Sequence, residues 1–191
     1  TYDVCHSCDF ISKQKGFLLT ADVEKSRYDT HQYSEEDHYY NNTFLNLIKE
    51  YIEPYKVKTV LDYGSGPFRV LTKFLKEQQY NVYDYDPYYH PDDSYQKEMF
   101  DLIVSTEVIE HFYDPIKEFD HLLSILKDKG YLLLMTNFRT MPHDEFINWW
   151  YKRDNTHVAF YNLNVFTYLE EKYNLKRLKT NEKNIILLQK R

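Results

Sequence analysis

Two glycines follow a short apolar run that ends in an acid, and this stretch carries the clearest chemistry of the chain. It reads Val-Leu-Asp-Tyr-Gly-Ser-Gly-Pro-Phe over residues 60–68. This order is typical of a buried strand that turns sharply into a helix. Gly64 lets the backbone bend, and Gly66 lets a ligand come close to the main chain. The unpaired N–H groups of the new helix would then face a nucleotide-like ligand with a carboxylate or phosphate.

A second candidate site consists of two carboxylates and an imidazole. Glu107, Glu110 and His111 stand at positions i, i+3 and i+4, so they share one face if the segment is helical. This donor set suits a divalent ion, and we expect His157 as a fourth ligand, with His143 as the alternative. Without a metal, His111 or His157 could serve as a general base for an oxygen or nitrogen nucleophile. Glu110 would then cap or solvate the start of the helix.

The two cysteines of the chain, Cys5 and Cys8, form a single C-x-x-C. Structural zinc takes four ligands, and a second pair of this kind is missing from the sequence. The pair is therefore either half of a zinc site, as the remnant of a zinc ribbon, or a pair of thiols that are free or redox-active.

The apolar pattern predicts alternating strands and helices that would position these residues. Helices are expected from Ser34 to before Pro54 and over 67–79, 106–113, 115–127 and 164–173, and strands over 57–62, 81–86, 100–105, 131–136, 175–179 and 184–189. We expect Gly130 to end the helix 115–127 and Asn164 to cap the last helix. The alternation predicts an α/β fold, a doubly wound, mostly parallel sheet with a C-terminal antiparallel strand pair and ligands at the carboxyl ends of the strands. Residues 1–33 are polar and irregular, and we interpret them as an N-terminal cysteine-containing segment before a domain that spans 34–191.

Size and charge narrow the class of protein. A chain of 191 residues fits one domain, which buries roughly 70% of its unfolded surface. The net charge is −6 with both signs scattered, so nucleic acid is not a favoured partner. The sequence holds no run of 18 apolar residues, and its first residues do not resemble a signal peptide. We therefore expect a cytoplasmic protein without a membrane partner.

From about residue 57 to residue 189 the sequence resembles the class I S-adenosylmethionine-dependent methyltransferases. The glycine stretch is similar to the first motif of that family, and an acid follows the second strand. The fourth-strand region reads Phe-Asp-Leu-Ile-Val-Ser-Thr-Glu-Val-Ile-Glu-His-Phe, and the fifth reads Leu-Leu-Ser-Ile-Leu-Lys-Asp-Lys-Gly-Tyr-Leu-Leu-Leu-Met-Thr. The resemblance implies the Rossmann-like fold of this family with a shortened third-strand region. It also implies an enzyme that uses S-adenosyl-L-methionine as its cofactor.

The resemblance assigns cofactor contacts to residues at strand ends. Asp86 would accept hydrogen bonds from both ribose hydroxyls, each worth about 1.5 to 3 kcal/mol, whereas Asp84 would be a surface or loop-bonding acid. Asp62 would orient the glycine loop and the amino end of the cofactor. Phe68 departs from the third small residue of the glycine motif, which disfavours a pyrophosphate and is compatible with a smaller nucleoside ligand. The other implied contacts are Gly64, Ser65, Gly66, Thr106 and Glu107, with Asp93 as a candidate for the adenine.

The resemblance also suggests roles for the tyrosines before the first strand and for the Glu-x-x-Glu-His sequence. Tyr28, Tyr39 and Tyr40 precede the first strand and could lie over the sulfonium of the cofactor as cation–π partners. The Glu-x-x-Glu-His sequence resembles the metal site of ubiquinone-pathway O-methyltransferases and small-RNA 3′-end methyltransferases, where the ion holds substrate hydroxyls. The resemblance therefore implies a divalent metal ion as a possible second cofactor.

The methyl acceptor is narrowed by what the sequence lacks. Asp-Pro-Tyr-Tyr at 86–89 mimics an amino-methylating motif but follows the second strand instead of the fourth, and no cysteine near the site offers the covalent route to pyrimidine C5. We therefore predict transfer to an oxygen or nitrogen of a small molecule. Two alternatives stay open: an RNA- or protein-modifying methyltransferase, and a non-catalytic protein that binds the cofactor.

Overall fold

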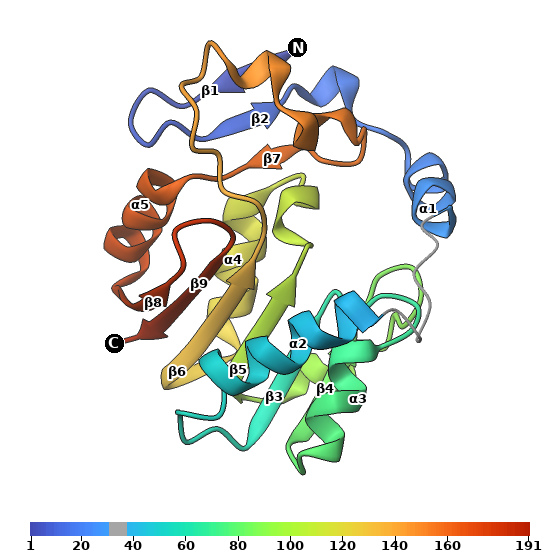
Figure 1. Cartoon of the computed structure of the whole chain (residues 1–191), viewed down its shortest axis with the longest axis vertical. Coiled ribbons are helices and arrows are strands. Elements are labelled where there is room, and N and C mark those ends of the chain that lie inside the picture. The colour runs from blue at the N-terminus through green and yellow to red at the C-terminus, as the bar shows by residue number, and fades with distance from the viewer. Residues whose placement is uncertain (31–37) are drawn as a thin grey trace.

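The core of the chain is a six-stranded sheet with the strand order β4-β3-β5-β6-β9-β8 (Figure 1). The computed structural model describes residues 1–30 and 38–191, with only the backbone of residues 38–40. Strands β3 (Thr59–Tyr63), β4 (Asn81–Tyr85), β5 (Phe100–Thr106) and β6 (Leu126–Met135) run parallel. Strand β9 (Ile185–Lys190) is antiparallel to β6 and pairs with β8 (Leu175–Thr180). This arrangement confirms the predicted α/β class and the C-terminal antiparallel pair.

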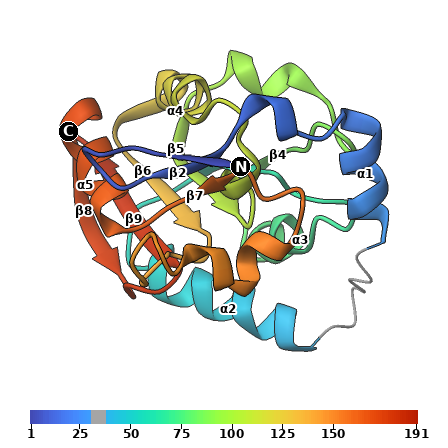
Figure 2. The same cartoon turned by 90° about the horizontal axis from the view of Figure 1, so that it is seen from above.

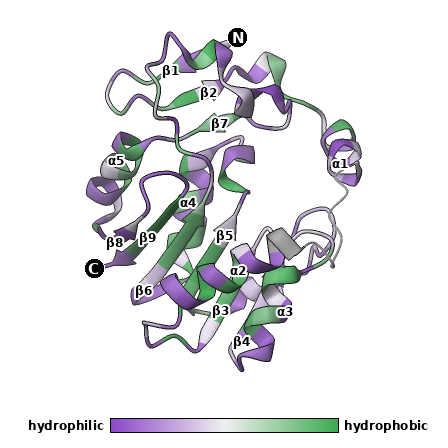
Figure 3. Cartoon of the chain, in the orientation of Figure 1, coloured by the Kyte–Doolittle hydropathy of each residue, from purple (hydrophilic) through white to green (hydrophobic). Residues whose placement is uncertain are grey.

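Alternate residues of the parallel strands point to opposite faces of the sheet, and two helices cover each face. The helices are α2 (His38–Tyr51), α3 (Val70–Glu77), α4 (Pro115–Ser124) and α5 (Leu163–Tyr173). Val60 and Leu102 share a core with α2 and α3, whereas their neighbours Leu61 and Ile103 share a core with α4 and α5. Figure 2 shows α2 and α4 on opposite sides of the sheet. The strands between them are largely apolar (Figure 3), as buried parallel strands require.

A second, three-stranded sheet lies beyond the carboxyl ends of β5 and β6 (Figure 1). It consists of β1 (Tyr2–Val4), β2 (Ile11–Lys13) and β7 (Ala159–Phe160), all antiparallel. The N-terminal segment that the sequence analysis interpreted as irregular therefore contains a hairpin paired with β7, then η1 (Lys15–Phe17) and the helix α1 (Ala21–Asp29). Ile11 and Phe160 are each 1% exposed in a small core of their own, which fixes the hairpin to the segment before α5.

The predicted helix over 106–113 is wrong. Only a short 3-10 turn, η3 (Ile109–His111), forms there. The N–H of Glu107 still donates to the backbone oxygen of Met135 at 2.7 Å, and Glu107 then turns into the left-handed region with a φ of 54°. A residue with positive φ cannot continue a right-handed helix, so Glu107 and Glu110 do not share a helical face.

Three other element boundaries also differ from the sequence analysis. Helix α4 ends at Ser124, and Gly130 lies inside β6, which already begins at Leu126, paired with Phe100 of β5. Asn162, and not Asn164, caps α5, since its side chain accepts from the N–H of Val165 at 3.0 Å.

Between β4 and β5 the chain forms only the 3-10 turn η2 (Asp93–Lys97), in agreement with a shortened third-strand region. None of the helices in the described ranges is long and apolar enough to cross a membrane.

We expect the two glycines of the turn after β3 to differ in their effect on stability. Gly64 has a φ of 87°, and a Cβ added there would lie 2.2 Å from Cγ2 of Val108. Gly64→Ala combines left-handed strain with overpacking, so it should lower the free energy of unfolding by at least about 3 kcal/mol. Gly66 has a φ of 65° with no described atom within 4 Å of the added Cβ, so Gly66→Ala should lower it by about 1 to 2 kcal/mol. Urea denaturation of both variants measures the difference, and equal losses would contradict this account of Gly64.

Candidate active site

The carboxyl ends of the parallel strands open into a cleft of about 1200 Å³. Its walls are the glycine turn after β3, the end of β4, the loop after β5, part of α1 and the segment before β7. Of the residues singled out in the sequence, those that line it include Tyr28, Asp62, Gly64, Ser65, Gly66, Phe68, Asp86, Thr106, Glu107, Glu110, His111 and His157. The fold thus brings the glycine motif and the histidine cluster into one cavity.

The glycine turn presents its main chain to the cleft. The N–H groups of Gly64 and Ser65 donate to the backbone oxygen of Tyr85 at 2.8 and 3.0 Å, which ties the turn to the end of β4. The main chain at Gly66 is open, because no described atom occupies the place of a Cβ. Helix α3 begins only at Val70, later than predicted, so the turn lies between the strand and the helix. A ligand can therefore approach the backbone at Gly66 closely.

Asp62 lies buried beneath the turn, with 1% of its surface exposed. The hydroxyl of Thr72 donates to its Oδ2 at 2.7 Å. Burial is the main cause that raises the pKa of Asp62 to about 7; the charges of Asp84 and Asp86 add to the rise, and Thr72 opposes it. A cation that enters the cleft would favour the ionised form, so this carboxyl group is suited to pair with one.

Asp86 connects the glycine turn to the loop that follows β4. Its Oδ1 accepts from the N–H groups of Tyr88 and Tyr89 at 2.9 and 3.0 Å, and its Oδ2 accepts from the N–H of Gly66 at 3.1 Å. A carboxylate has about four acceptor positions, so one remains for a ligand hydroxyl beside these three bonds.

The other acids near β4 lie away from the cleft. Asp84 pairs with Arg69 at 2.8 Å and with Lys76 at 3.6 Å, which places it among surface charges as the sequence analysis expected. Asp93 belongs to η2 and does not line the cleft. Phe68, in contrast to these acids, lines the cleft beside the glycine turn, where its side chain is partly open to solvent at 38% exposed.

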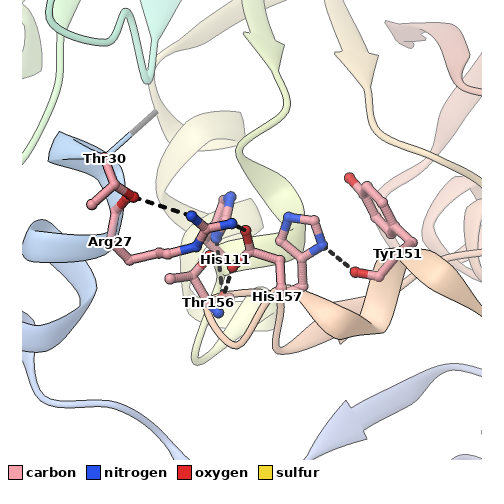
Figure 4. A network of polar contacts seen from close by, with 7 residues as sticks. Arg27, Thr30, His111, Tyr151, Thr156 and His157 are labelled. Carbon is pink, nitrogen blue, oxygen red and sulfur yellow. Dashed lines mark hydrogen bonds and ion pairs between the residues drawn. The ribbon is translucent and has the colours of Figure 1, made fainter. Parts of the chain in front are cut away.

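Three side chains meet at the other end of the cleft. The ligand atoms of Glu110, His111 and His157 all lie within 4.8 Å of one another. Nδ1 of His111 lies 3.0 Å from the backbone oxygen of Thr156, and Nδ1 of His157 lies 2.7 Å from that of Tyr151 (Figure 4). A carbonyl oxygen can only accept, so in the neutral rings each Nδ1 carries the proton and each Nε2 keeps the lone pair. The backbone therefore orients two basic nitrogens.

Two buried carboxyl groups share the hydroxyl of Tyr151. Its oxygen lies 2.5 Å from Oε1 of Glu110, 3.0 Å from Oε2 of Glu107 and 3.1 Å from Oγ1 of Thr136. A hydroxyl has one proton, so contacts to both carboxyl groups require that one of them is protonated. Burial first, and then the charge of Glu110, raise the pKa of Glu107 well above its ordinary value; burial raises the pKa of Glu110 as well. The two groups therefore do not both carry a charge at neutral pH.

The tyrosines expected over the cofactor are only partly described. Tyr28 lines the cleft, and its ring stands at 90° to the ring of His111 with 5.3 Å between their centres. The side chains of Tyr39 and Tyr40 lie outside the described part of the chain. Sequence reasoning missed Tyr151 and the buried acid Glu24 on α1, because no motif or periodicity marks either residue.

The cysteine pair and the alternative histidine lie away from the cleft. Cys5 is exposed and Cys8 is buried, in the turn between β1 and β2. Backbone N–H groups of Cys8 and Ser7 lower the pKa of the Cys5 thiol, whereas burial raises that of Cys8. In the described ranges the only group of three or more metal-ligating side chains is the one in the cleft, so zinc at the cysteines stays a prediction. His143 is exposed and does not line the cleft.

Comparison with solved structures shows the same fold in several methyltransferases. A putative S-adenosylmethionine-dependent methyltransferase from Methanococcus maripaludis is 15% identical, with a TM-score of 0.59 over 93% of this chain and 95% of that chain. The plantazolicin methyltransferase BpumL in complex with SAH is 11% identical, with a TM-score of 0.55 over 88% of this chain and 89% of that chain. The mitomycin 7-O-methyltransferase MmcR is 12% identical, with a TM-score of 0.52 over 100% of this chain and 79% of that chain. No curated protein sequence matches the chain.

A family model connects the sequence itself to this fold. The model described as a methyltransferase domain matches residues 33–180, which is most of the chain. The matched region contains the glycine turn, the strand end at Asp86 and the histidine cluster. The chain therefore belongs to the class I S-adenosylmethionine-dependent methyltransferases, as its motifs predicted, and is an enzyme of that family.

Proposed function

We propose that this methyltransferase transfers the methyl group to an oxygen or nitrogen of a small molecule, with His111 and His157 as the general bases. The observation that carries this proposal is the position of the histidine pair in the same cleft as the glycine turn. Both Nδ1 atoms are held by backbone carbonyl groups, so both Nε2 atoms are placed to take a proton.

The residues at the other end of the cleft fit S-adenosylmethionine in their chemistry. The open main chain at Gly66 gives the ligand a close approach to the turn. Asp86 has an acceptor position left for a ribose hydroxyl beside its three backbone donors. Asp62, whose pKa is raised to about 7 chiefly by burial, would ionise next to the amino group of the ligand. When bound, the cofactor supplies a methyl group on a positively charged sulfur.

The proposed step moves one methyl group and one proton. A lone pair on the acceptor oxygen or nitrogen forms the bond to the methyl carbon while the carbon–sulfur bond breaks and its electron pair stays on sulfur. The proton of the acceptor passes to Nε2 of His111 or His157. Positioning contributes most of the rate enhancement, and a well-placed base adds about 10² to 10⁴.

The size and charge of the protein favour a small acceptor over RNA or protein. Ligand cavities are roughly 300 to 1,000 Å³, so a cleft of about 1200 Å³ leaves room for an acceptor beside a nucleoside-sized cofactor. A net charge of −6 disfavours a polyanionic acceptor that binds unaided. An RNA or protein acceptor is the alternative, and loss of turnover with retained cofactor binding is the second alternative.

A divalent ion held by Glu110, His111 and His157 is a further candidate, which the convergence of their ligand atoms within 4.8 Å favours. Glu110 is fully buried, and its Oε2 has no hydrogen-bond partner among the described residues, so a cation there would satisfy it. Backbone acceptors at both Nδ1 atoms are typical of metal-binding histidines. When bound, such an ion would lower the pKa of an acceptor hydroxyl.

Loss of Asp86 is expected to weaken cofactor binding. Asp86→Ala removes a charged acceptor of one ribose hydroxyl, worth about 1.5 to 3 kcal/mol, so the affinity for S-adenosylhomocysteine should fall roughly ten- to 150-fold in calorimetry. Asp84→Ala is the matched control, because Asp84 lies two residues earlier, on β4, does not line the cleft, and pairs with Arg69 and Lys76. Equal affinities for parent and Asp86→Ala would remove Asp86 from the cofactor site.

The small-molecule proposal is tested with isotope-labelled S-adenosylmethionine and a cell extract separated into small-molecule, RNA and protein fractions. We expect label in the small-molecule fraction with the parent enzyme. His111→Gln and His157→Gln should each slow the transfer by about tenfold or more, since the other histidine can serve as a weaker base. His143→Gln is the control, because His143 is exposed and outside the cleft. Label in RNA or protein alone would select the alternative, and no label in any fraction would favour a binding protein.

The metal candidate is tested by calorimetry with magnesium, manganese and zinc, with S-adenosylhomocysteine present and the two cysteines alkylated. Glu110→Gln and His157→Gln should each weaken binding of the preferred ion by at least about tenfold, because each removes one of three ligands. Circular dichroism confirms that the variants are folded. A parent protein that binds none of the three ions would defeat the metal site while leaving the histidines as bases.

A further inference from the structure

Helix α1 lies at the mouth of the cleft without an apolar face of its own. Glu24 is the only buried residue of this helix, at 6% exposed, whereas Val23 is 53% exposed. Three residues of α1 line the cleft, namely Glu24, Arg27 and Tyr28. The half-buried ring of Tyr28 packs against Tyr88 and His111, but the described residues of the helix bury no aliphatic side chain. The helix therefore gains little from the hydrophobic effect, and polar contacts contribute much to its position.

Those contacts converge on the carboxylate of Glu24. Oε1 accepts from the hydroxyl of Tyr28 at 2.7 Å, and Oε2 accepts from the hydroxyl of Tyr88 at 2.6 Å. The hydroxyl of Tyr113 lies 3.2 Å from Oε2 and 3.0 Å from the backbone oxygen of Leu19 on the segment before α1, so both acceptors share its one proton. The three tyrosines come from α1, from the loop after β4 and from the loop after β5. Burial first, together with Glu24, raises the pKa of all three tyrosines, for Tyr113 to about 12, so their hydroxyls remain donors.

The same helix also contacts the residues that orient the histidines. Arg27 pairs with Asp154 at 2.9 Å, and Asp154 accepts from the backbone N–H and the hydroxyl of Thr156 at 3.0 and 2.7 Å. The backbone oxygen of Thr156 is the acceptor for Nδ1 of His111 (Figure 4). The ring of Tyr28 also contacts the ring of His111, with 5.3 Å between their centres. The position of α1 is therefore connected to the orientation of His111 by two separate routes.

Tyr88 links α1 to the cofactor end as well. Its N–H donates to Asp86 at 2.9 Å while its hydroxyl donates to Glu24 at 2.6 Å. Asp86, which we place on the ribose, and Glu24, which holds α1, therefore both accept a hydrogen bond from Tyr88.

We propose that Glu24 is a positioning residue that latches α1 over the bound cofactor and holds Tyr28 against His111, an inference that rests on the proposed function. Release of the latch exposes little apolar surface, so α1 can open at a free energy far below that of global unfolding. Opening gives the cofactor and its product a way in and out, and closing completes the cleft around the histidine pair.

The test measures the dissociation rate of S-adenosylhomocysteine by stopped-flow tryptophan fluorescence, since Trp150 lines the cleft. Glu24→Ala should raise this rate by at least about tenfold, because bonds to a charged acceptor are lost. Glu24→Gln should restore part of the difference, since its amide oxygen still accepts. Asp22→Ala changes the same charge on the exposed face of the same helix and should leave the rate unchanged. The thermal midpoint of Glu24→Ala should shift by less than about 4 °C.

Hydrogen exchange without cofactor separates the latch from the proposed function. Amides of α1 should exchange faster in Glu24→Ala than in the parent, while amides of the central sheet should not change. A parent that does not bind S-adenosylhomocysteine would defeat the proposed function, and the exchange of α1 would then decide on the latch alone. If Glu24→Ala does not fold, both measurements are made instead on the double variant Tyr88→Phe with Tyr113→Phe. This variant removes two of the three tyrosine hydroxyls that lie around the carboxylate of Glu24. Unchanged dissociation together with unchanged exchange would overturn the proposal.

Discussion

The hydroxyl of Tyr151 fixes the acceptor end of the cleft, because it lies between two carboxyl groups that burial prevents from both being charged. Glu107 and Glu110 stand in the loop after β5, so the hydroxyl locks the segment 150–153 onto that loop. The backbone oxygen of the same tyrosine accepts from Nδ1 of His157, and therefore the position of this histidine follows from the carboxyl pair. A buried polar network is costly where a member lacks its partner, and Oε2 of Glu110 has none among the described residues, so this end of the cleft still has an acceptor to offer a ligand.

The N-terminal hairpin completes the support of the histidines from outside the central sheet. Val158 donates its N–H to the backbone oxygen of Glu110 and accepts from the N–H of Lys13, both at 2.8 Å. The residue next to His157 is thus held between the turn that carries His111 and the strand β2. Asp9, beside the cysteine pair, binds Arg139 and the cap of α5, Asn162. The cysteine turn is therefore docked on the domain by side chains, with Cys8 buried in the core and Cys5 exposed.

The central sheet could be predicted because it follows from local patterns, and the residues predicted to bind the cofactor at its edge, Gly64, Gly66 and Asp86, line the cleft. An apolar run, two glycines and an acid at the next strand end are adjacent in sequence, and the parallel fold brings them to one edge. For the end of the cleft that holds the histidines, the sequence analysis named the residues that lie there but not their geometry. His111 and His157 do lie together, yet the helical argument for Glu107 and Glu110 failed at the positive φ of Glu107. Tyr151 and Glu24 were missed because their partners lie 41 and 64 residues away, a distance over which periodicity carries no information.

The glycine turn and helix α1 are held in the cleft wall by different kinds of interaction. The glycine turn and Asp86 are fixed by backbone hydrogen bonds between β3 and β4, over a core in which Val60 and Leu61 are fully buried. Helix α1 has no such core beneath it and is held by hydroxyl–carboxylate bonds that water can replace. The free energy of local opening is smaller for an element that buries less apolar area, so α1 is an element of the cleft wall that can move without disturbing the sheet. A rigid strand edge under a polar, detachable cover is the arrangement that the proposed exchange of cofactor requires.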